Sequence, residues 1–231
     1  MIVLGINTSS KVGSVALTSD QQLLGESALQ VGEACLRNLL AMIDYLLSET
    51  HLTIKDVDLF VVVLGPGSWS SLRIGVTTAK SLAHACNKPI LGVTTTDVLA
   101  HNLRYTDKFV YSVISARKGP VFYAGYDCGG EIPQRITDYR FAPWNTLFDE
   151  LTSPSVVLLD DSLREYGHAL PEHDPAITIG ARSLCQIRPS FVNEAGLHRF
   201  AHSGTGDTLS LVPLYFQETE AESKWALTHN S

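Results

Sequence analysis

The chain has 231 residues, of which 45% are hydrophobic, so it is long enough to build a buried core in one or two domains. Its 24 acidic residues outnumber its 17 basic residues, and the formal net charge is −7 at pH 7. A surface of this sign repels a phosphate backbone, which argues against charge-driven binding of nucleic acid. We expect a partner to hold any nucleic acid that this protein serves.

The cysteines and the apolar segments indicate where the protein works. Cys35, Cys86, Cys128 and Cys185 lie far apart, with neither the paired spacing of a zinc site nor the density of a disulfide scaffold. The first residues lack the basic segment and long apolar stretch of a signal peptide, and the later run Leu59 to Leu64 is too short to cross a bilayer. We therefore expect a cytoplasmic protein without a membrane anchor.

The first 105 residues predict strands followed by alternating helices and strands. Apolar and alternating segments predict three consecutive antiparallel strands at 2–6, 12–17 and 23–29. Apolar residues at three-and-four spacing predict a helix over 33–50. The elements expected after it are a buried strand at 59–64, a helix at 69–86 with Ser68 as its N-cap, a strand at 89–93 and a helix near 96–104.

A new series of strands begins after residue 106 and predicts a second domain. The expected elements are strands at 109–114, 121–126, 135–141 and 155–159 and helices at 143–151 and 191–203, with nothing placed over 160–190. This order predicts a duplicated α/β unit of mixed sheets, with domains 1–105 and 106–231 and a C-terminal tail that packs back on the first. The actin, Hsp70 and sugar-kinase fold, which is ribonuclease H-like, repeats in this way.

The loop Gly65-Pro66-Gly67-Ser68 stands between a predicted strand and a predicted helix. Glycines let the backbone turn sharply here, and the first N–H groups of the helix lie at the positive end of its dipole. Such a loop can receive a phosphate or carboxylate, although the Lys of a Walker loop is missing. The alternative is a tight strand-to-helix connection without a ligand.

Asn7, Thr8 and Ser9 follow the first predicted strand and supply an amide and two hydroxyls. Kinases of this fold class hold a metal-bound phosphate at this point of the chain. The neutral amide of Asn7 cannot neutralise a divalent cation as an aspartate would, so a Mg-nucleotide is harder to hold. The alternative is an Asx or Ser/Thr turn that only joins two strands.

Residue types that could carry metal or nucleophilic chemistry form no convincing set. His198 and His202 stand four apart in a predicted helix, but no Glu between them offers a general base and the sequence indicates no third ligand. A Ser-His-Asp triad need not be contiguous, and no Gly-x-Ser-x-Gly elbow is present. We expect no catalytic residue, no metal and no cofactor.

The helix predicted over 33–50 carries apolar residues on more than one face, which is wider than packing on a single sheet requires. A partner helix could use the surplus, or the extra residues could simply belong to the core. The predicted partner interface consists of Leu36, Leu39, Leu40, Ile43 and Leu47 of this helix and Leu72, Val76 and Ala79 of the helix at 69–86.

Several dispersed segments together resemble the TsaB (YeaZ-type) family over nearly the whole chain. The family string Gly-Pro-Gly-Ser-Phe-Thr-Gly-Leu-Arg-Ile-Gly is similar to residues 65–75, GPGSWSSLRIG. Its opening Ile-Asp-Thr-Ser is similar to Ile6-Asn7-Thr8-Ser9, and its Asp-Ala-Arg-x-Gly-Glu-Val-Tyr pattern to residues 115–122, SARKGPVF. The family's closing Pro-x-Tyr-Leu-Arg is similar to residues 213–217, PLYFQ, and an acidic tail follows in both.

The resemblance implies a two-domain member of the actin, Hsp70 and sugar-kinase superfamily that lacks the metal-ligand helix of its catalytic paralogue TsaD. Such a protein pairs through helices of its first domain with TsaD, or with a second copy of itself, and TsaE docks on the heterodimer. TsaD transfers threonylcarbamoyl to adenosine 37 of tRNAs that read codons beginning with A. This chain would touch tRNA only through that complex.

Four positions depart from the family pattern. Asn7 and Ser115 replace aspartates, Ser71 replaces a glycine and Pro120 replaces a glutamate. These changes weaken a nucleotide or metal role and leave the pairing helices chemically intact. The sequence therefore favours a non-catalytic partner of TsaD over the alternative, which is a free-standing phosphotransferase or glycoprotease-like hydrolase of the same fold.

Overall fold

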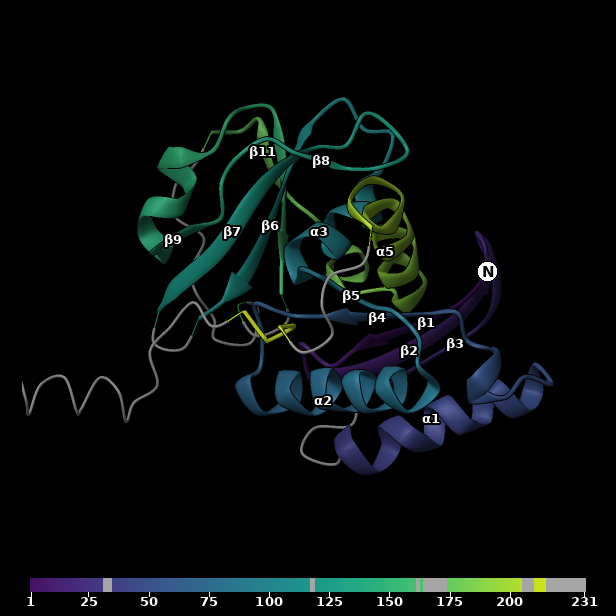
Figure 1. Ribbon diagram of the computed structural model, residues 1–231. Coiled ribbons are helices and arrows are strands. Elements are labelled where there is room, and N and C mark those ends of the chain that lie inside the picture. The colour runs from purple at the N-terminus through teal and green to yellow at the C-terminus, as the bar shows by residue number, and fades with distance from the viewer. Residues whose placement is uncertain (31–34, 117–118, 161–162, 164–173, 205–209, 215–231) are drawn as a thin grey trace, which may run out of the picture.

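The computed structural model describes residues 1–30, 35–116, 119–160, 163, 174–204 and 210–214, with the side chains of the first helix described from Asn38 onward. Figure 1 shows two β-sheets, with a layer of two helices on the outer side of the first sheet and further helices between the sheets.

The first sheet has five strands in the order β3-β2-β1-β4-β5. They are β1 (Ile2–Asn7), β2 (Val12–Ser19), β3 (Gln22–Gln30), β4 (Leu59–Val63) and β5 (Ile90–Val93). Strands β1, β2 and β3 are antiparallel neighbours, whereas β1, β4 and β5 are parallel. The three consecutive antiparallel strands predicted at the N-terminus are confirmed.

The second sheet repeats this order as β8-β7-β6-β10-β11, and β9 also pairs with β7. Its strands are β6 (Phe109–Ser115), β7 (Pro120–Asp127), β8 (Gln134–Arg135), β9 (Arg140–Pro143), β10 (Ser155–Leu159) and β11 (Ile177–Ile179). As at β1 in the first sheet, the strands on one side of β6 pair antiparallel and those on its other side pair in parallel. The predicted duplicated α/β unit of mixed sheets is confirmed.

Helices cover both faces of the first sheet. Helices α1 (Cys35–Glu49) and α2 (Trp69–Cys86) lie on its outer face, and α5 (Pro189–Ser203) lies on the opposite face beside α3 (Thr95–Ala100) (Figure 1). Short 3₁₀ helices complete the chain at η2 (Ile54–Asp56), η3 (His101–Leu103), η4 (Trp144–Glu150) and η5 (Arg182–Cys185). In the part of the chain that the structure describes, no helix is long and apolar enough to cross a membrane.

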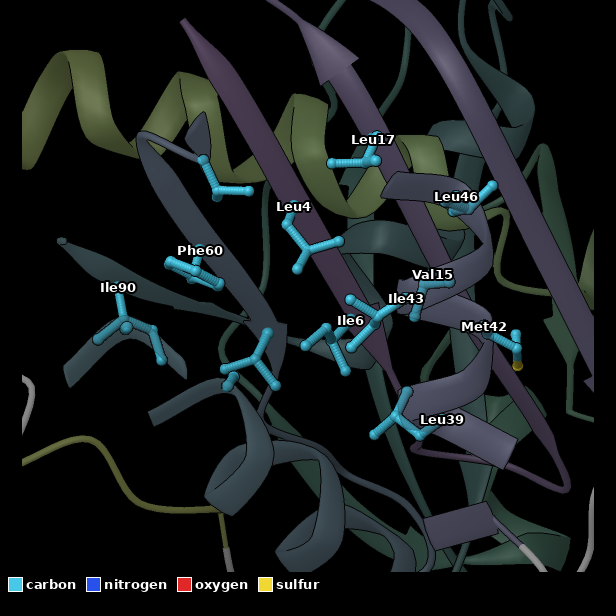
Figure 2. Close-up of a cluster of buried hydrophobic side chains, with 14 of the residues drawn as sticks. Leu4, Ile6, Val15, Leu17, Leu39, Met42, Ile43, Leu46, Phe60 and Ile90 are labelled. Carbon is cyan, nitrogen blue, oxygen red and sulfur yellow. The ribbon is translucent and has the colours of Figure 1, made fainter. Parts of the chain in front are cut away.

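The strand alternation explains why the first sheet is buried on both faces. Leu4 and Ile6 of β1 point into the core under α1 and α2, while Val3 belongs to the core on the α5 side. In β4, Phe60 and Val62 face the outer helices, whereas Leu59, Val61 and Val63 face α5. Figure 2 shows the outer core, in which α1 side chains meet those of β1 and β2.

Helix α5 is held on the first sheet by a buried amide. The Asn193 Nδ2 donates to the carbonyl oxygens of Val3 at 3.1 Å and Ala16 at 3.3 Å and to Thr18 Oγ1 at 3.2 Å. The side chain needs the space above Gly5, where a Cβ would overlap Asn193 Oδ1. A helix from the end of the chain is thereby fixed to the first two strands.

Several predicted elements differ in type or extent. The strand expected over 135–141 is wrong as a single element, because β8 ends at Arg135 and β9 begins only at Arg140. The helix expected over 143–151 is the 3₁₀ helix η4, and the helix near 96–104 is α3 followed by η3. Helix α5 begins at Pro189, a favoured residue for the first turn, and so two residues earlier than predicted.

The first sheet ends with β5 at Val93 and the second begins with β6 at Phe109, but side-chain packing crosses between these two parts of the sequence. Helix α5 lies on the first sheet although it follows the second sheet in sequence. Residues 210–214 also return there, where Leu211 and Leu214 pack against the core under α2. The first sheet is therefore completed by residues from the end of the chain.

Candidate functional site

The turn after β1 is closed by its own hydrogen bonds. Asn7 Oδ1 accepts from the Ser9 backbone N–H at 3.0 Å and from Ser9 Oγ at 2.8 Å, and Asn7 Nδ2 donates to Ser14 Oγ at 3.2 Å. Asn7, Thr8 and Ser9 are each at most 3% exposed. The amide thus stabilises an Asx turn, and its polar atoms already have partners within the protein.

The glycine loop packs directly on this turn. The Ser68 backbone N–H donates to the Ser9 carbonyl oxygen at 2.8 Å, and Thr8 Oγ1 donates to the Ser71 carbonyl oxygen at 2.7 Å. A Cβ on Gly67 would overlap the backbone of Ser9. The backbone N–H of Ser68, at the N-cap of α2, is therefore already bound to protein.

Ser68 stands at the predicted N-cap of α2, but its predicted capping bond is wrong. Its side chain makes no hydrogen bond to the backbone of the first turn and instead lies 3.1 Å from Ser71 Oγ. Ser71 occupies the position of the family's glycine and supplies both this hydroxyl and the carbonyl that holds Thr8. The Ser71 hydroxyl therefore adds a contact with Ser68, whereas the bond from Thr8 uses the backbone carbonyl, which a glycine would also supply.

Two further segments hold the glycine loop from other sides. The Thr95 backbone N–H donates to the Gly65 carbonyl oxygen at 2.9 Å, and Thr95 Oγ1 donates to the Pro66 carbonyl oxygen at 2.6 Å. The Leu214 backbone N–H donates to the Leu64 carbonyl oxygen at 2.8 Å. Gly65 has φ +116°, a conformation that favours glycine, and its bond to Pro66 is cis. The loop is thus tied into the fold along its length.

The corresponding end of β6 in the second sheet is bound by a carboxylate that sequence reasoning missed, Asp160, which follows β10. Asp160 Oδ2 accepts from the Ser115 backbone N–H at 2.9 Å and from Ser115 Oγ at 3.0 Å, and Oδ1 accepts from the Leu163 backbone N–H at 2.9 Å. Ser115 stands where the family pattern has an aspartate. An acidic residue directly after the buried strand β10 was the available signal.

The predicted partner interface needs correction for most of its residues. Leu39, Ile43, Leu47, Leu72, Val76 and Ala79 are at most 6% exposed, and all except Leu72 belong to the core between the sheet and the two helices. They cannot contact a partner unless the fold opens, because they pack inside this chain. Leu40 is 51% exposed, and the side chain of Leu36 lies outside the described residues.

The outward surface of α1 and α2, which we call the outer face, carries a different set of residues. Its exposed residues are Leu40, Ala41, Asp44, Tyr45, Ser48 and Glu49 of α1 and Ser70, Arg73, Thr77, Ser81, His84 and Ala85 of α2. Leu40 and the 60% exposed Tyr45 are its large apolar side chains. Most of the exposed residues of α2 are small, so another helix could approach its backbone closely.

The two histidines on α5 lie close to each other. The rings of His198 and His202 lie 4.2 Å apart between centroids, and His202 Nδ1 is 2.8 Å from the His198 carbonyl oxygen. Among the residues with a described position, no group of three or more His, Cys, Asp or Glu side chains is placed to hold a metal ion.

Comparison with known proteins identifies the family. The model of the family described as TsaD, tRNA N6-adenosine threonylcarbamoyltransferase, matches residues 30–157, which is more than half of the chain. The chain belongs to the TsaD family. A tRNA N6-adenosine threonylcarbamoyltransferase from Brachyspira hyodysenteriae is 36% identical over 109 residues, which cover 40% of this chain and 32% of that protein.

Similarity over the full length is to TsaB members. The tRNA threonylcarbamoyladenosine biosynthesis protein TsaB of Bacillus subtilis is 29% identical over 236 residues, covering 97% of this chain and 98% of that protein. The solved structure of YeaZ from Pseudomonas aeruginosa has a TM-score of 0.78 and 21% identity, covering 93% of this chain and 99% of that chain. The TsaB (YeaZ-type) resemblance and the actin, Hsp70 and sugar-kinase-like fold are confirmed.

Proposed function

We propose that this chain is a non-catalytic partner subunit in the formation of threonylcarbamoyladenosine in tRNA. The observation that carries the proposal is the similarity to a protein named for this biosynthesis, which extends over nearly the whole length of both chains. In this proposal the chain pairs with a TsaD protein, TsaE docks on that heterodimer, and TsaD modifies adenosine 37 of tRNAs that read codons beginning with A. The net charge of −7 is consistent with contact to tRNA only through the complex.

The closed turns of the first half support a role without phosphotransfer. Thr8 and Ser9 bind the backbone at the start of α2 through the Ser71 carbonyl and the Ser68 N–H, and Asn7 uses its amide within the turn. A nucleotide phosphate bound at this turn would have to displace these hydrogen bonds and enter beside a neutral amide. A free-standing phosphotransferase or glycoprotease-like hydrolase is the alternative, and no contact described above favours it.

The outer face of α1 and α2 is the proposed pairing surface. It places Leu40 and Tyr45 in solvent on a helix whose opposite side is fully engaged in the core. Helix packing against this face would bury both side chains, and exposed apolar side chains of this size commonly anchor interfaces. The same face could join two copies of this chain when TsaD is absent.

Size-exclusion chromatography with light scattering tests the proposal, using this chain mixed with TsaD of the same organism. Changing Leu40→Asp together with Tyr45→Asp should abolish the complex, because the interface would bury two unpaired carboxylates. The matched control is Ile136→Asp with Tyr105→Asp, since these side chains are 45% and 71% exposed in the second half and at the junction. The control pair should bind as the wild type does.

Each outcome of this experiment is informative. Loss of the complex in the outer-face variant alone, with an unchanged circular dichroism spectrum, supports pairing through α1 and α2. Equal binding by all three proteins would show that another surface pairs. A wild-type chain that forms no complex, even with nucleotide and TsaE added, would overturn the partner role and direct attention to phosphotransfer and hydrolysis assays.

A further inference from the structure

The four residues Thr94–Asp97, at the start of α3, contact both the glycine loop and the second sheet. Thr94 is the N-cap of α3 and accepts from the Asp97 backbone N–H at 3.1 Å. Thr94, Thr95 and Thr96 are at most 6% exposed, although each has a polar side chain. Buried hydroxyls are retained in a fold when they make specific hydrogen bonds, so their partners reveal what this segment does.

Towards the first half, this segment fixes the glycine loop. Thr95 holds two successive carbonyl groups, those of Gly65 at 2.9 Å and Pro66 at 2.6 Å. The backbone N–H of Leu64 donates to the Val93 carbonyl oxygen at 2.9 Å, so the loop and the segment leave adjacent strands side by side. Helix α2 begins directly after this loop.

Towards the second half, Asp97 binds two tyrosines. Its Oδ1 accepts from the hydroxyl of Tyr126 at 2.7 Å, and its carboxylate lies 3.4 Å from the hydroxyl of Tyr139. The Tyr139 hydroxyl also donates to Thr94 Oγ1 at 3.2 Å, and the guanidinium of Arg135 stacks over its ring at 4.1 Å. Tyr126 lies in strand β7 and is 1% exposed.

Breaking the hydrogen bond between Tyr126 and Asp97 should cost free energy, because Tyr126 is buried. Burial and the neighbouring Asp97 carboxylate hold the pKa of Tyr126 well above its usual value, so the hydroxyl keeps its proton and donates. Loss of the carboxylate would leave a phenol without its acceptor in an almost fully buried position. Leu99 and Ala100 of α3 also pack with Tyr126, which adds an apolar contact to the polar one.

We propose that Thr94–Asp97 is a rigid connection between the second sheet and the glycine loop, so that the two halves move as one body. The carboxylate of Asp97 fixes the segment to β7, and the hydroxyl and amide of Thr95, two residues earlier, fix the loop from which α2 begins. A displacement of the second sheet is therefore transmitted to the start of α2. Asp97 is a positioning residue in this view, and the coupling does not depend on the proposed partner role.

Hydrogen exchange followed by mass spectrometry tests the coupling in Asp97→Ala, Tyr126→Phe and the double variant. Exchange over residues 64–72 should rise by about tenfold or more in each single variant, although neither change touches that loop. The double variant should exchange little faster than either single variant, because both changes remove the same bond. Exchange over 38–49 of α1 should stay as in the wild type.

The chain offers two matched controls. Tyr123→Phe removes a hydroxyl from the same strand, but that hydroxyl donates to Glu150 on the other face of the second sheet, so exchange over 64–72 should not change. Thr95→Val should raise exchange over 64–72 although Asp97 is intact, because it removes the hydroxyl that binds Pro66. Thr95→Ser keeps a hydroxyl, so its exchange over 64–72 should stay close to that of the wild type. Tyr139→Phe provides a milder variant should Asp97→Ala fail to fold.

The proposal is overturned if exchange in the Asp97 and Tyr126 variants increases over 120–127 but not over 64–72. That result would mean that the contact stabilises the second sheet without transmitting anything to the loop. A uniform increase across all segments in these variants, including Tyr139→Phe, would likewise overturn it, because the contact would then contribute only global stability.

Discussion

The two halves share one strand order but are covered by different helices. The first sheet carries α1 and α2, of 15 and 18 residues, on its outer face, whereas the corresponding position after the antiparallel strands of the second sheet holds η4, a 3₁₀ helix of 7 residues. A 3₁₀ helix has poorer hydrogen-bond geometry and is seldom long. In the part of the chain that the structure describes, the strands therefore define the duplicated fold, while α1 and α2 form a long helical surface on the first sheet.

A charge in the core of the first half should lower the free energy of unfolding by the largest amount. Leu39→Asp places a carboxylate at a position that is 1% exposed, and we expect it to lower the free energy of unfolding by about 4 kcal/mol or more. Leu40→Asp, one residue later on the outer face, should change it by about 0.5 kcal/mol or less. Urea unfolding followed by circular dichroism measures both, and similar losses would contradict the assignment of the two faces of α1.

A methyl group in the glycine loop should cause the next largest loss of stability. Gly67→Ala should cost roughly 1–3 kcal/mol, because its Cβ would overlap the Ser9 backbone, which cannot move without disturbing β1. Gly130→Ala in the second half meets no atom within 4 Å and should be neutral or slightly stabilising. Thermal unfolding of both variants gives the comparison, and equal melting temperatures would show that the turn does not pack on the loop.

Acid should weaken the contact between η3 and α5. His101 is 4% exposed, and burial lowers its pKa below the usual 6.5. Below pH 6.5 the unfolded chain therefore binds a proton at this residue more readily than the folded chain does. Stability from this group is complete above pH 6.5 and falls as the pH drops below it. Free energies of unfolding at pH 7.5 and 5.5 should differ less in His101→Gln than in the wild type; an unchanged difference would exclude His101 as the cause.

The smallest effect is expected at an exposed ion pair of the first half. Lys88 Nζ lies 3.0 Å from Asp58 Oδ1, and Asp58 also accepts from the Ile2 backbone N–H at 2.9 Å. Lys88→Gln should cost about 0–1 kcal/mol, because both side chains are partly in water. Asp58→Asn should cost somewhat more, since the backbone bond lowers the pKa of Asp58 and is weakened by the loss of charge. Chemical unfolding at low salt measures both, and a larger loss for Lys88→Gln would contradict this order.

Part of the candidate site was accessible from the sequence. The sequence predicted a turn at Asn7 and a strand-to-helix loop at Gly65 and Gly67, and the structure has both. The partner of the loop was not accessible, because Thr95 is about 30 positions later and its hydroxyl meets Pro66 only after β4 and β5 pair. Asp160 was missed although it directly follows a buried strand, because its contact with Ser115 forms only when β6 and β10 pair.

The sequence by itself determined the elements whose signals are local. Alternation and apolar runs predicted the five strands of the first sheet and β6, β7 and β10 of the second, and three-and-four spacing predicted α1 and α2, because these patterns reflect the repeat of the backbone. The tertiary structure alone decided which side of α1 is buried, since the helix packs against both the sheet and α2. It also decided that α5 completes the first sheet and that Asp97 meets Tyr126, because contacts between distant residues depend on how the whole chain packs.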